Sequence, residues 1–452
     1  MIIRRMLIAN RGEIAVRIIR TCRRLGIETV LAVSDADTCS LPARLADATV
    51  RIGPPPPAAS YLNVDAVVSA AVAAGVDAVH PGYGFLAENP ALARACTQAG
   101  IVFVGPPEEQ LAAVGDKLAA RAHAVAADLP VVPGGEVGDA AAARELAAEI
   151  GYPVLVKAVG GGGGRGMKPV HDPDRLSETV DLAMSEARAA FGNPRVYLER
   201  FVACGRHVEV QLLGDGASII HLGTRDCSVQ RRYQKLVEEA PAPALDDALR
   251  EDMHRAAVAF GRHLGYRGLG TVEFLVDSAR ACFYFLEMNA RIQVEHPVTE
   301  EICGLDLVAE QIAVAEGHPL RLVQADVVPS GHAIECRINA EDWRDTFRPH
   351  PGTVTDARWP AGPGIRVDTH LQAGADVPPF YDSLLAKLIV HAETRDAALE
   401  RLRGAVARCR IEGVTTTVDM HAALAADPEF AAGGVDTAWF SRFLARTGAG
   451  YG

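Results

Sequence analysis

Strand and helix patterns alternate from the first residues of this chain, and this alternation restricts the fold more than any other feature. The apolar run at residues 6–9 predicts a buried strand. Residues 13–25 carry the apolar spacing of an amphipathic helix that ends at Gly26, and residues 29–33 predict the next strand. A strand, a helix and a second strand in this order form a βαβ unit, which joins parallel strands.

The same alternation continues to residue 104. The further predicted elements are a helix, a strand, a helix and a strand, near residues 64–74, 78–80, 91–99 and 101–104. They extend an open parallel sheet, for which we predict a first domain at residues 1–115. A dinucleotide site on such a sheet would need Gly-x-Gly-x-x-Gly after its first strand. Residues 10–13 supply a single glycine, so NAD binding is excluded.

Two further domains are expected, because 452 residues exceed the size of one ordinary domain. The central domain is placed at residues 116–330, with a mobile lid at about 129–200 and alternating, antiparallel-looking strands after it. The third, α+β domain is placed at residues 331–452. The predicted fold class is therefore a multidomain α/β protein with an N-terminal open parallel sheet.

Composition and charge exclude several classes of function. The formal net charge of −12 disfavours a nucleic-acid surface. Apolar runs are short, so no membrane span is expected, and the N-terminal segment lacks the pattern of a signal peptide. The nine cysteines are scattered singly without zinc-type spacing, which predicts a cytoplasmic protein without a structural metal.

A row of alternating polar residues follows the apolar segment 282–286. Its members are Glu287, Asn289, Arg291, Gln293 and Glu295. In an extended strand, alternate side chains share one face, so all five would point the same way. An edge strand with a wet face would show the same pattern. Because this polar row directly continues a segment expected to be a buried strand, the pattern favours a cleft that holds a ligand.

A second candidate element is the glycine run at residues 160–164, which follows Lys157. Glycine lets backbone amides approach an anion closely, although such a run is also typical of a flexible linker. Because it follows a strand within an ordered segment, we interpret it as a cover for phosphates. His207 and Glu209 would share the face of another alternating strand and line the same cleft.

Carboxylates and bases on neighbouring segments complete the candidate site. Glu273 lies on an otherwise apolar strand, and with Glu287 and Asn289 it offers the oxygen ligands that suit Mg²⁺, although a salt bridge would also explain it. The basic segment 225–235 fits either a solvated loop or the anion side of the cleft, where Lys235 would act as a point charge.

Together these motifs resemble the ATP-grasp superfamily and, within it, the biotin carboxylase family. The resemblance covers nearly the whole chain. It rests most specifically on Glu-Met-Asn-Ala-Arg-Ile-Gln-Val-Glu-His-Pro at 287–297, and also on segments 8–15, 80–86, 115–117, 160–167, 225–235, 238–243, 335–342 and 381–383. It implies a central ATP-grasp domain with a mobile lid.

The resemblance also implies a role for each candidate residue. ATP phosphates would be held by Lys117, Lys157, His207, Gly163 and Gly164, the adenine by Glu199, Arg200, Phe201 and Val202, and the ribose by Gln230 and Tyr233. Two Mg²⁺ ions, with Mn²⁺ as a substitute, would be held by Glu273, Glu287 and Asn289. Bicarbonate would be positioned by Lys235, Arg291 and Val294, Glu295 would remove its proton, and Arg337 would stabilise the biotin enolate. Gln293 is a further predicted cofactor-binding residue.

The implied activity is ATP- and bicarbonate-dependent carboxylation of biotin through carboxyphosphate, the first half-reaction of an acetyl- or acyl-CoA carboxylase. The chain ends at Gly452 without a biotinyl motif, so a separate biotin carboxyl carrier protein is expected. The resemblance also implies carboxyltransferase subunits and, by analogy with bacterial members, a homodimer. Alternatives are another ATP-grasp carboxylate–amine ligase and a non-catalytic ATP-binding scaffold. Tyr233, Arg200 and Thr417 depart from the family pattern, but none of them removes a phosphate, metal or bicarbonate ligand. Because Tyr233 can still hydrogen-bond a ribose hydroxyl, we expect a changed nucleotide affinity rather than lost activity.

Overall fold

The N-terminal part of the protein is a parallel sheet covered by helices. The structure is a computed structural model that describes residues 2–159 and 167–448. In that part of the chain, five parallel strands are ordered β3(Ala48–Gly53), β2(Glu28–Ser34), β1(Arg5–Ile8), β4(Ala78–His80) and β5(Val102–Phe103). Helix α1(Gly12–Leu25) ends as expected at Gly26, which takes the left-handed conformation with φ 71°. The predicted open parallel sheet is confirmed.

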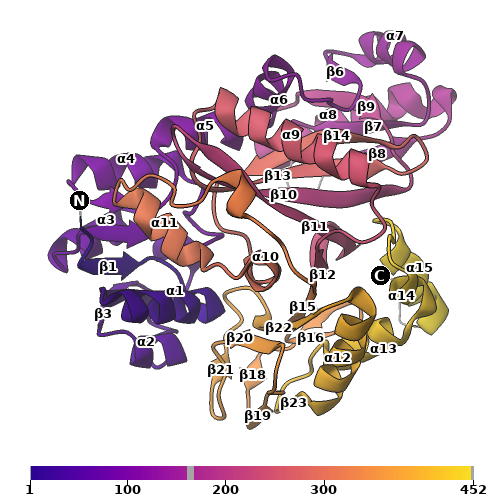
Figure 1. The fold of residues 1–452 in the computed structure, drawn as a ribbon. Helices are drawn as coiled ribbons and strands as arrows, with labels where there is room; N and C mark the ends of the chain where they lie inside the picture. The colour runs from indigo at the N-terminus through magenta and orange to yellow at the C-terminus, as the bar shows by residue number, and fades with distance from the viewer. Residues whose placement is uncertain (1, 160–166, 449–452) are drawn as a thin grey trace.

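A small separate sheet forms the predicted lid region (Figure 1). Its described strands are ordered β6(Gly134–Val137), β9(Val196–Arg200), β7(Val154–Ala158) and β8(Met167–Val170). Helices α7(Ala140–Ile150) and α8(Leu176–Phe191) pack against it around a core of its own, which includes Val156 and Leu198. This separate core makes the lid sheet a distinct packing unit.

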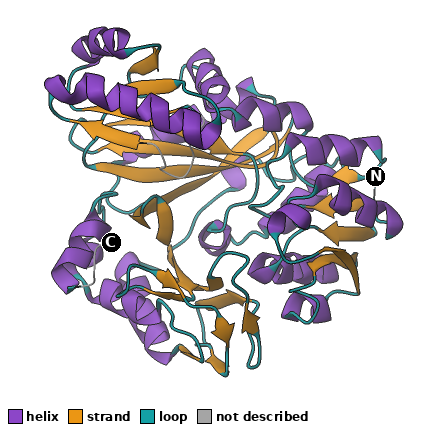
Figure 2. Cartoon of the chain, turned by 180° about the vertical axis from the view of Figure 1, so that it is seen from behind, coloured by secondary structure: helices purple, strands orange, loops and turns teal. Residues whose placement is uncertain are grey.

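A long antiparallel sheet runs through the rest of the molecule. Its described strands are ordered β14(Cys282–Asn289), β13(Arg267–Asp277), β10(Gly205–Asp215), β11(Ile219–Arg231), β12(Gln234–Ala240), β15(His332–Asn339), β22(Leu384–Ala392) and β20(Ile365–Thr369). Strand β12 pairs with β15, so the sheet continues across residue 330. Helix α9(Asp247–His263) covers β10 and β11, and α12(Arg395–Arg408) covers β15 and β22. Figure 2 shows the molecule from behind, with the strands that precede residue 330 and the strands that follow it on opposite sides of the centre.

The other elements connect and cap these sheets. Helices α10(His296–Cys303) and α11(Leu307–Ala315) pack between the long sheet and the N-terminal part. The remaining described helices are α2(Leu41–Leu45), α3(Val64–Ala73), α4(Pro90–Gln98), α5(Glu108–Gly115), α6(Lys117–Ala126), α13(Val418–Ala426), α14(Pro428–Ala432) and α15(Trp439–Thr447). Short strands are β16(Glu341–Asp342), β17(Arg348–Pro349), β18(Gly352–Thr353), β19(Asp356–Arg358), β21(Asp376–Val377) and β23(Arg410–Glu412). Among residues 2–159 and 167–448, no helix has the length and apolar character needed to cross a bilayer.

One local expectation was wrong. The polar row does not continue as one strand, because β14 ends at Asn289 and α10 begins at His296, so Arg291, Gln293 and Glu295 lie on the loop between them. For the basic segment 225–235 the structure decides between the two alternatives: most of it lies on β11 and β12, which pair as a hairpin, and Gln230 and Lys235 line the pocket described below, so it is not a solvated loop. Residues 291–295 therefore reach the interior of the molecule on a loop, whereas periodicity predicts a strand.

Candidate active site

A single pocket of about 1140 Å³ lies where the lid sheet, the long sheet and the C-terminal part meet. Every residue of the described part of the chain to which the resemblance assigns a role lines it, whereas Glu209 does not. They are Lys117, Lys157, Glu199, Arg200, Phe201, Val202, His207, Gln230, Tyr233, Lys235, Glu273, Glu287, Asn289, Arg291, Gln293, Val294, Glu295 and Arg337. Gly163 and Gly164 lie outside the described residues. The pocket therefore unites residues from distant segments of the sequence.

At the lid end, Lys157 and Glu199 contact each other across neighbouring strands. The Lys157 Nζ atom donates a hydrogen bond of 2.6 Å to Glu199 Oε1. The adjacent Arg200 instead donates from its guanidinium to the carbonyl of Ile150 at 3.2 and 3.1 Å, so this bond ties β9 to the end of helix α7. Tyr233 stands at the rim with 56% of its surface exposed.

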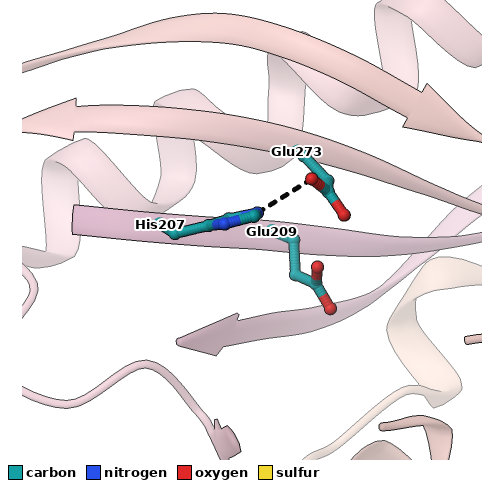
Figure 3. Close-up of side chains that lie close together, drawn as sticks. All are labelled: His207, Glu209 and Glu273. Atoms are coloured by element: carbon teal, nitrogen blue, oxygen red, sulfur yellow. Dashed lines mark ion pairs between the residues drawn. The ribbon is translucent and has the colours of Figure 1, made fainter. Parts of the chain in front are cut away.

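Facing carboxylates form the next part of the pocket. Glu273 on β13 lies opposite Glu287 on β14, and Asn289 Nδ2 donates to Glu273 Oε1 at 2.8 Å. Figure 3 shows His207 pointing to Glu273, with Nε2 and Oε2 2.9 Å apart, and Glu209 beside them. Burial would raise the pKa of Glu273, but Lys235 and His207 hold it well below its usual value. The predicted shared face of His207 and Glu209 is present.

These oxygens satisfy the requirements of a hard divalent cation. Burial, and then the charge of Glu273, raise the pKa of Glu287 above its usual value. A buried and a half-buried carboxylate that face each other repel, and a cation between them would remove that cost. Glu273, Glu287 and Asn289 supply the all-oxygen ligand set that Mg²⁺ prefers.

Lys235 lies at the centre of the acidic cluster. Its Nζ atom donates to Glu209 Oε2 at 2.7 Å, Glu273 Oε1 at 3.0 Å and Glu295 Oε1 at 2.6 Å. Burial alone would lower the pKa of Lys235, but the surrounding carboxylates raise it well above its usual value. Lys235 therefore stays positively charged and offers a fixed charge to an anion.

Arg291 is held by a carboxylate that comes from the N-terminal part of the chain. Glu88, just before α4, accepts a 3.0 Å bond from Arg291 Nε and a 2.9 Å bond from the amide of Ala290. The other end of the guanidinium donates to Asn289 Oδ1 and Gln293 Oε1, each at 2.9 Å. Sequence reasoning missed Glu88, although it lies two residues beyond the quoted segment 80–86.

Glu295 is fully buried between cations. It accepts the bond from Lys235 and another of 2.9 Å from Arg337 Nη2. Burial would raise the pKa of Glu295, but Lys235 and Arg337 hold it well below its usual value. Next to it, the Val294 carbonyl accepts a 2.8 Å bond from the buried Lys387, which fixes the loop. Glu295 is therefore an ionised carboxylate, the form that accepts a proton.

Comparison with known proteins gives the same family over all three parts of the chain. Family models match residues 2–111 (Biotin carboxylase, N-terminal domain), 116–323 (Carbamoyl-phosphate synthase L chain, ATP binding domain) and 335–442 (Biotin carboxylase C-terminal domain). The biotin carboxylase of a Nostoc species is 49% identical over 438 residues, 96% of this chain and 98% of the relative. The chain belongs to the biotin carboxylase family. The biotin carboxylase of Pseudomonas aeruginosa is also 49% identical, over 97% of this chain and 98% of its own.

Solved structures of biotin carboxylases share the fold closely. A biotin carboxylase complex with β,γ-ATP from Campylobacter jejuni superposes with a TM-score of 0.93 at 43% identity, covering 98% of this chain and 99% of the other. The biotin carboxylase domain dimer of the 2-oxoglutarate carboxylase of Hydrogenobacter thermophilus, in complex with MgADP and bicarbonate, has a TM-score of 0.93. It is 42% identical and covers 100% of both chains. The predicted family and fold class are confirmed.

Proposed function

We infer that this chain catalyses the carboxylation of biotin with ATP and bicarbonate, giving ADP, phosphate and N1-carboxybiotin by way of carboxyphosphate. The observation that carries this inference is the cluster in which Lys235 and Arg337 both bind the buried carboxylate of Glu295, a short way along the pocket from Glu273 and Glu287. A site for one acid–base step on a small anion thus adjoins a site suited to phosphates and a cation.

At the nucleotide end, Lys117, Lys157 and His207 are proposed to bind the phosphates, and so are Gly163 and Gly164. Lys157 must leave Glu199 to do so, which frees that carboxylate for the adenine amino group. Phosphoryl transfer depends on positioning and charge rather than on covalent help from the protein. Mg²⁺ held by Glu273, Glu287 and Asn289 would neutralise charge on the phosphate oxygens.

Bicarbonate is proposed to bind between Lys235 and Arg291, next to Gln293 and Val294. Glu295 then removes its proton, and the resulting anion attacks the γ-phosphate of ATP, giving ADP and carboxyphosphate. Glu88 keeps the Arg291 fork in place during this step. A fixed guanidinium and a fixed ammonium need no reorganisation when charge develops on the substrate.

Biotin is proposed to react at Arg337. Carboxyphosphate breaks to CO₂ and phosphate, and the phosphate takes the proton from the ureido nitrogen N1 of biotin. Arg337 stabilises the negative charge on the ureido oxygen, and N1 then attacks CO₂.

The remaining proposed contacts are to the nucleoside of ATP. Gln230 and Tyr233 contact the ribose, and Glu199 to Val202 contact the adenine.

We also propose the partners and the domain limits. Biotin reaches this chain on a carrier protein, a carboxyltransferase uses the product, and the chain forms a homodimer. The biotin carboxylase domain of Hydrogenobacter thermophilus is described as a dimer, which supports the last point. Domains are proposed at residues 1–115, 116–330 and 331–452.

The test is ADP release by the purified protein with MgATP and bicarbonate, with and without free biotin. Biotin-stimulated, bicarbonate-dependent release that stops when EDTA removes Mg²⁺ is the expected result. Release with an amine in place of biotin would instead identify a carboxylate–amine ligase. Nucleotide binding without any turnover would identify a scaffold subunit.

A further inference from the structure

Two acidic side chains face each other beneath the biotin end of the pocket. Strands β12 and β15 pair in the register that sets Glu238 directly opposite Glu335. Both residues are 0% exposed. Carboxylates in directly opposed positions repel each other if both are charged, and burial increases that repulsion. The pair therefore cannot carry two negative charges.

The two carboxylates differ in their partners. Glu238 Oε1 accepts a 2.6 Å bond from Arg337 Nε and lies 2.5 Å from Arg337 Nη2. Within residues 2–159 and 167–448, neither oxygen of Glu335 has a hydrogen-bond partner. A buried, unpartnered carboxylate is costly as an anion and much less costly as a neutral acid. The proton of the pair therefore belongs on Glu335, and the charge on Glu238.

Two carboxylates, those of Glu238 and Glu295, bind Arg337 in this arrangement. Its Nη2 atom contacts Glu238 and also donates to Glu295 Oε2 at 2.9 Å. Its side chain is 17% exposed and lines the pocket. Two carboxylates from different segments thus determine where the planar guanidinium lies.

Other charged groups also face the pair. Glu295 and Lys235 act on Glu238, and Lys387 on β22 acts on Glu335. Helix α10 packs on these strands and carries His296 and Glu300. His296 contacts the Gln293 carbonyl, and Glu300 binds the side chains of Arg17 and Arg366. These two α10 groups therefore have partners of their own.

The direction in which each group titrates agrees with the geometry. Burial raises the pKa of Glu238 to about 7, although Arg337 opposes this effect. Burial also raises the pKa of Glu335 well above its usual value, although Lys387 opposes it. Near neutral pH, Glu335 keeps its proton while Glu238 changes its charge.

We propose that Glu238 is a positioning residue for the reaction of biotin: as an anion it holds the Arg337 guanidinium in place, and Glu335 opposite it stays a neutral acid. This rests on the proposed role of Arg337 towards biotin. As pH falls through the range in which Glu238 gains a proton, Arg337 loses one of its two anionic partners. The efficiency of the biotin step should fall, and formation of carboxyphosphate should fall much less.

The test measures kcat/KM for free biotin from pH 6 to 9, together with bicarbonate-dependent ADP release without biotin. In Glu238→Gln we expect kcat/KM for biotin at pH 8 to fall about 10- to 100-fold. The acid limb near pH 7 should disappear, and release without biotin should change less than about threefold. An acid limb that persists unchanged in Glu238→Gln, or an equal loss of both activities, would overturn the proposal.

Two further variants keep the proposal falsifiable if Glu238→Gln folds poorly. Glu335→Gln mimics the neutral acid, so it should fold and keep the acid limb; loss of that limb would show that Glu335 is the titrating group and overturn the assignment. Glu239→Gln, on the same strand, removes a buried carboxylate that binds His332 and Arg395. It should lower thermal stability and leave the pH profile unchanged, and a changed profile would mean that the effect is not specific to Glu238.

A last comparison separates this inference from the proposed function. Arg337→Met should abolish the response to biotin. If it does not, the proposed role of Arg337 fails, and the inference fails with it. If Arg337→Met loses the response while Glu238→Gln behaves like wild type, only the positioning role of Glu238 fails.

Discussion

Replacement of Glu295 by Gln tests the acid–base step most directly. The amide keeps the shape and one acceptor oxygen but cannot take the bicarbonate proton. Lys235 retains Glu209 and Glu273, and Arg337 retains Glu238, so the fold should survive with a loss of about 1–3 kcal/mol in the free energy of unfolding. A missing general base typically costs about 10²- to 10⁴-fold in rate, which raises the barrier by about 3–5 kcal/mol.

The assay is biotin-stimulated ADP release, paired with calorimetric titration of ATP. Turnover should fall by the stated factor, while the dissociation constant for ATP changes less than about threefold, because Glu295 contacts Cys227, Lys235 and Arg337 on the bicarbonate side. Glu301 on helix α10 pairs with Arg366 on β20, and Glu301→Gln is the matched control, which should retain turnover. Equal losses of ATP affinity and turnover in Glu295→Gln would mean that the residue is structural.

Three other outcomes are expected. Glu88→Gln should raise KM for bicarbonate about tenfold by loosening Arg291 and leave KM for ATP unchanged; parallel rises in both constants would refute this role. Tyr233→Phe should change KM for ATP about two- to fivefold with little effect on kcat, since the side chain lies at the exposed rim, and a tenfold loss of kcat would contradict this. Burial would raise the pKa of Asp368, but the charge of Arg366 lowers it to about 2. Ionised Asp368 therefore stabilises the fold above pH ~4 by about 2 kcal/mol. That contribution should disappear as pH falls towards 2 in acid-unfolding curves of wild type and Asp368→Asn, and identical curves would exclude it.

Local periodicity predicted the regular elements well. The first strand, expected at residues 6–9, is β1(Arg5–Ile8), and the first helix ends at the expected glycine. Such patterns depend on near neighbours in the chain, which the sequence displays directly. The prediction of one continuous strand was wrong beyond Asn289, because strands and loops with alternating polar residues look alike in the sequence. In the structure β14 ends at Asn289, and a loop leads to the helix that begins at His296.

The contacts that set the site were harder to predict, because they join distant segments. Glu88 and Arg291 are 203 positions apart, and their bond exists only because the N-terminal part packs on the loop after β14. Likewise, the facing of Glu238 and Glu335 follows from the pairing of β12 with β15. Residue types and motifs indicated which side chains belong to the pocket, whereas tertiary packing decides which of them hold the others in place.

The continuity of the long sheet across residue 330 has a consequence for how the chain can be divided. A fragment that ends there would leave β12 without β15, from Val237 to Ala240, and would expose a row of unpaired backbone groups together with two carboxylates that are buried in the whole protein. Exposed edges of this kind template aggregation. The boundary between the second and third segments is thus a boundary in sequence only, and an expression trial that follows it should give insoluble protein.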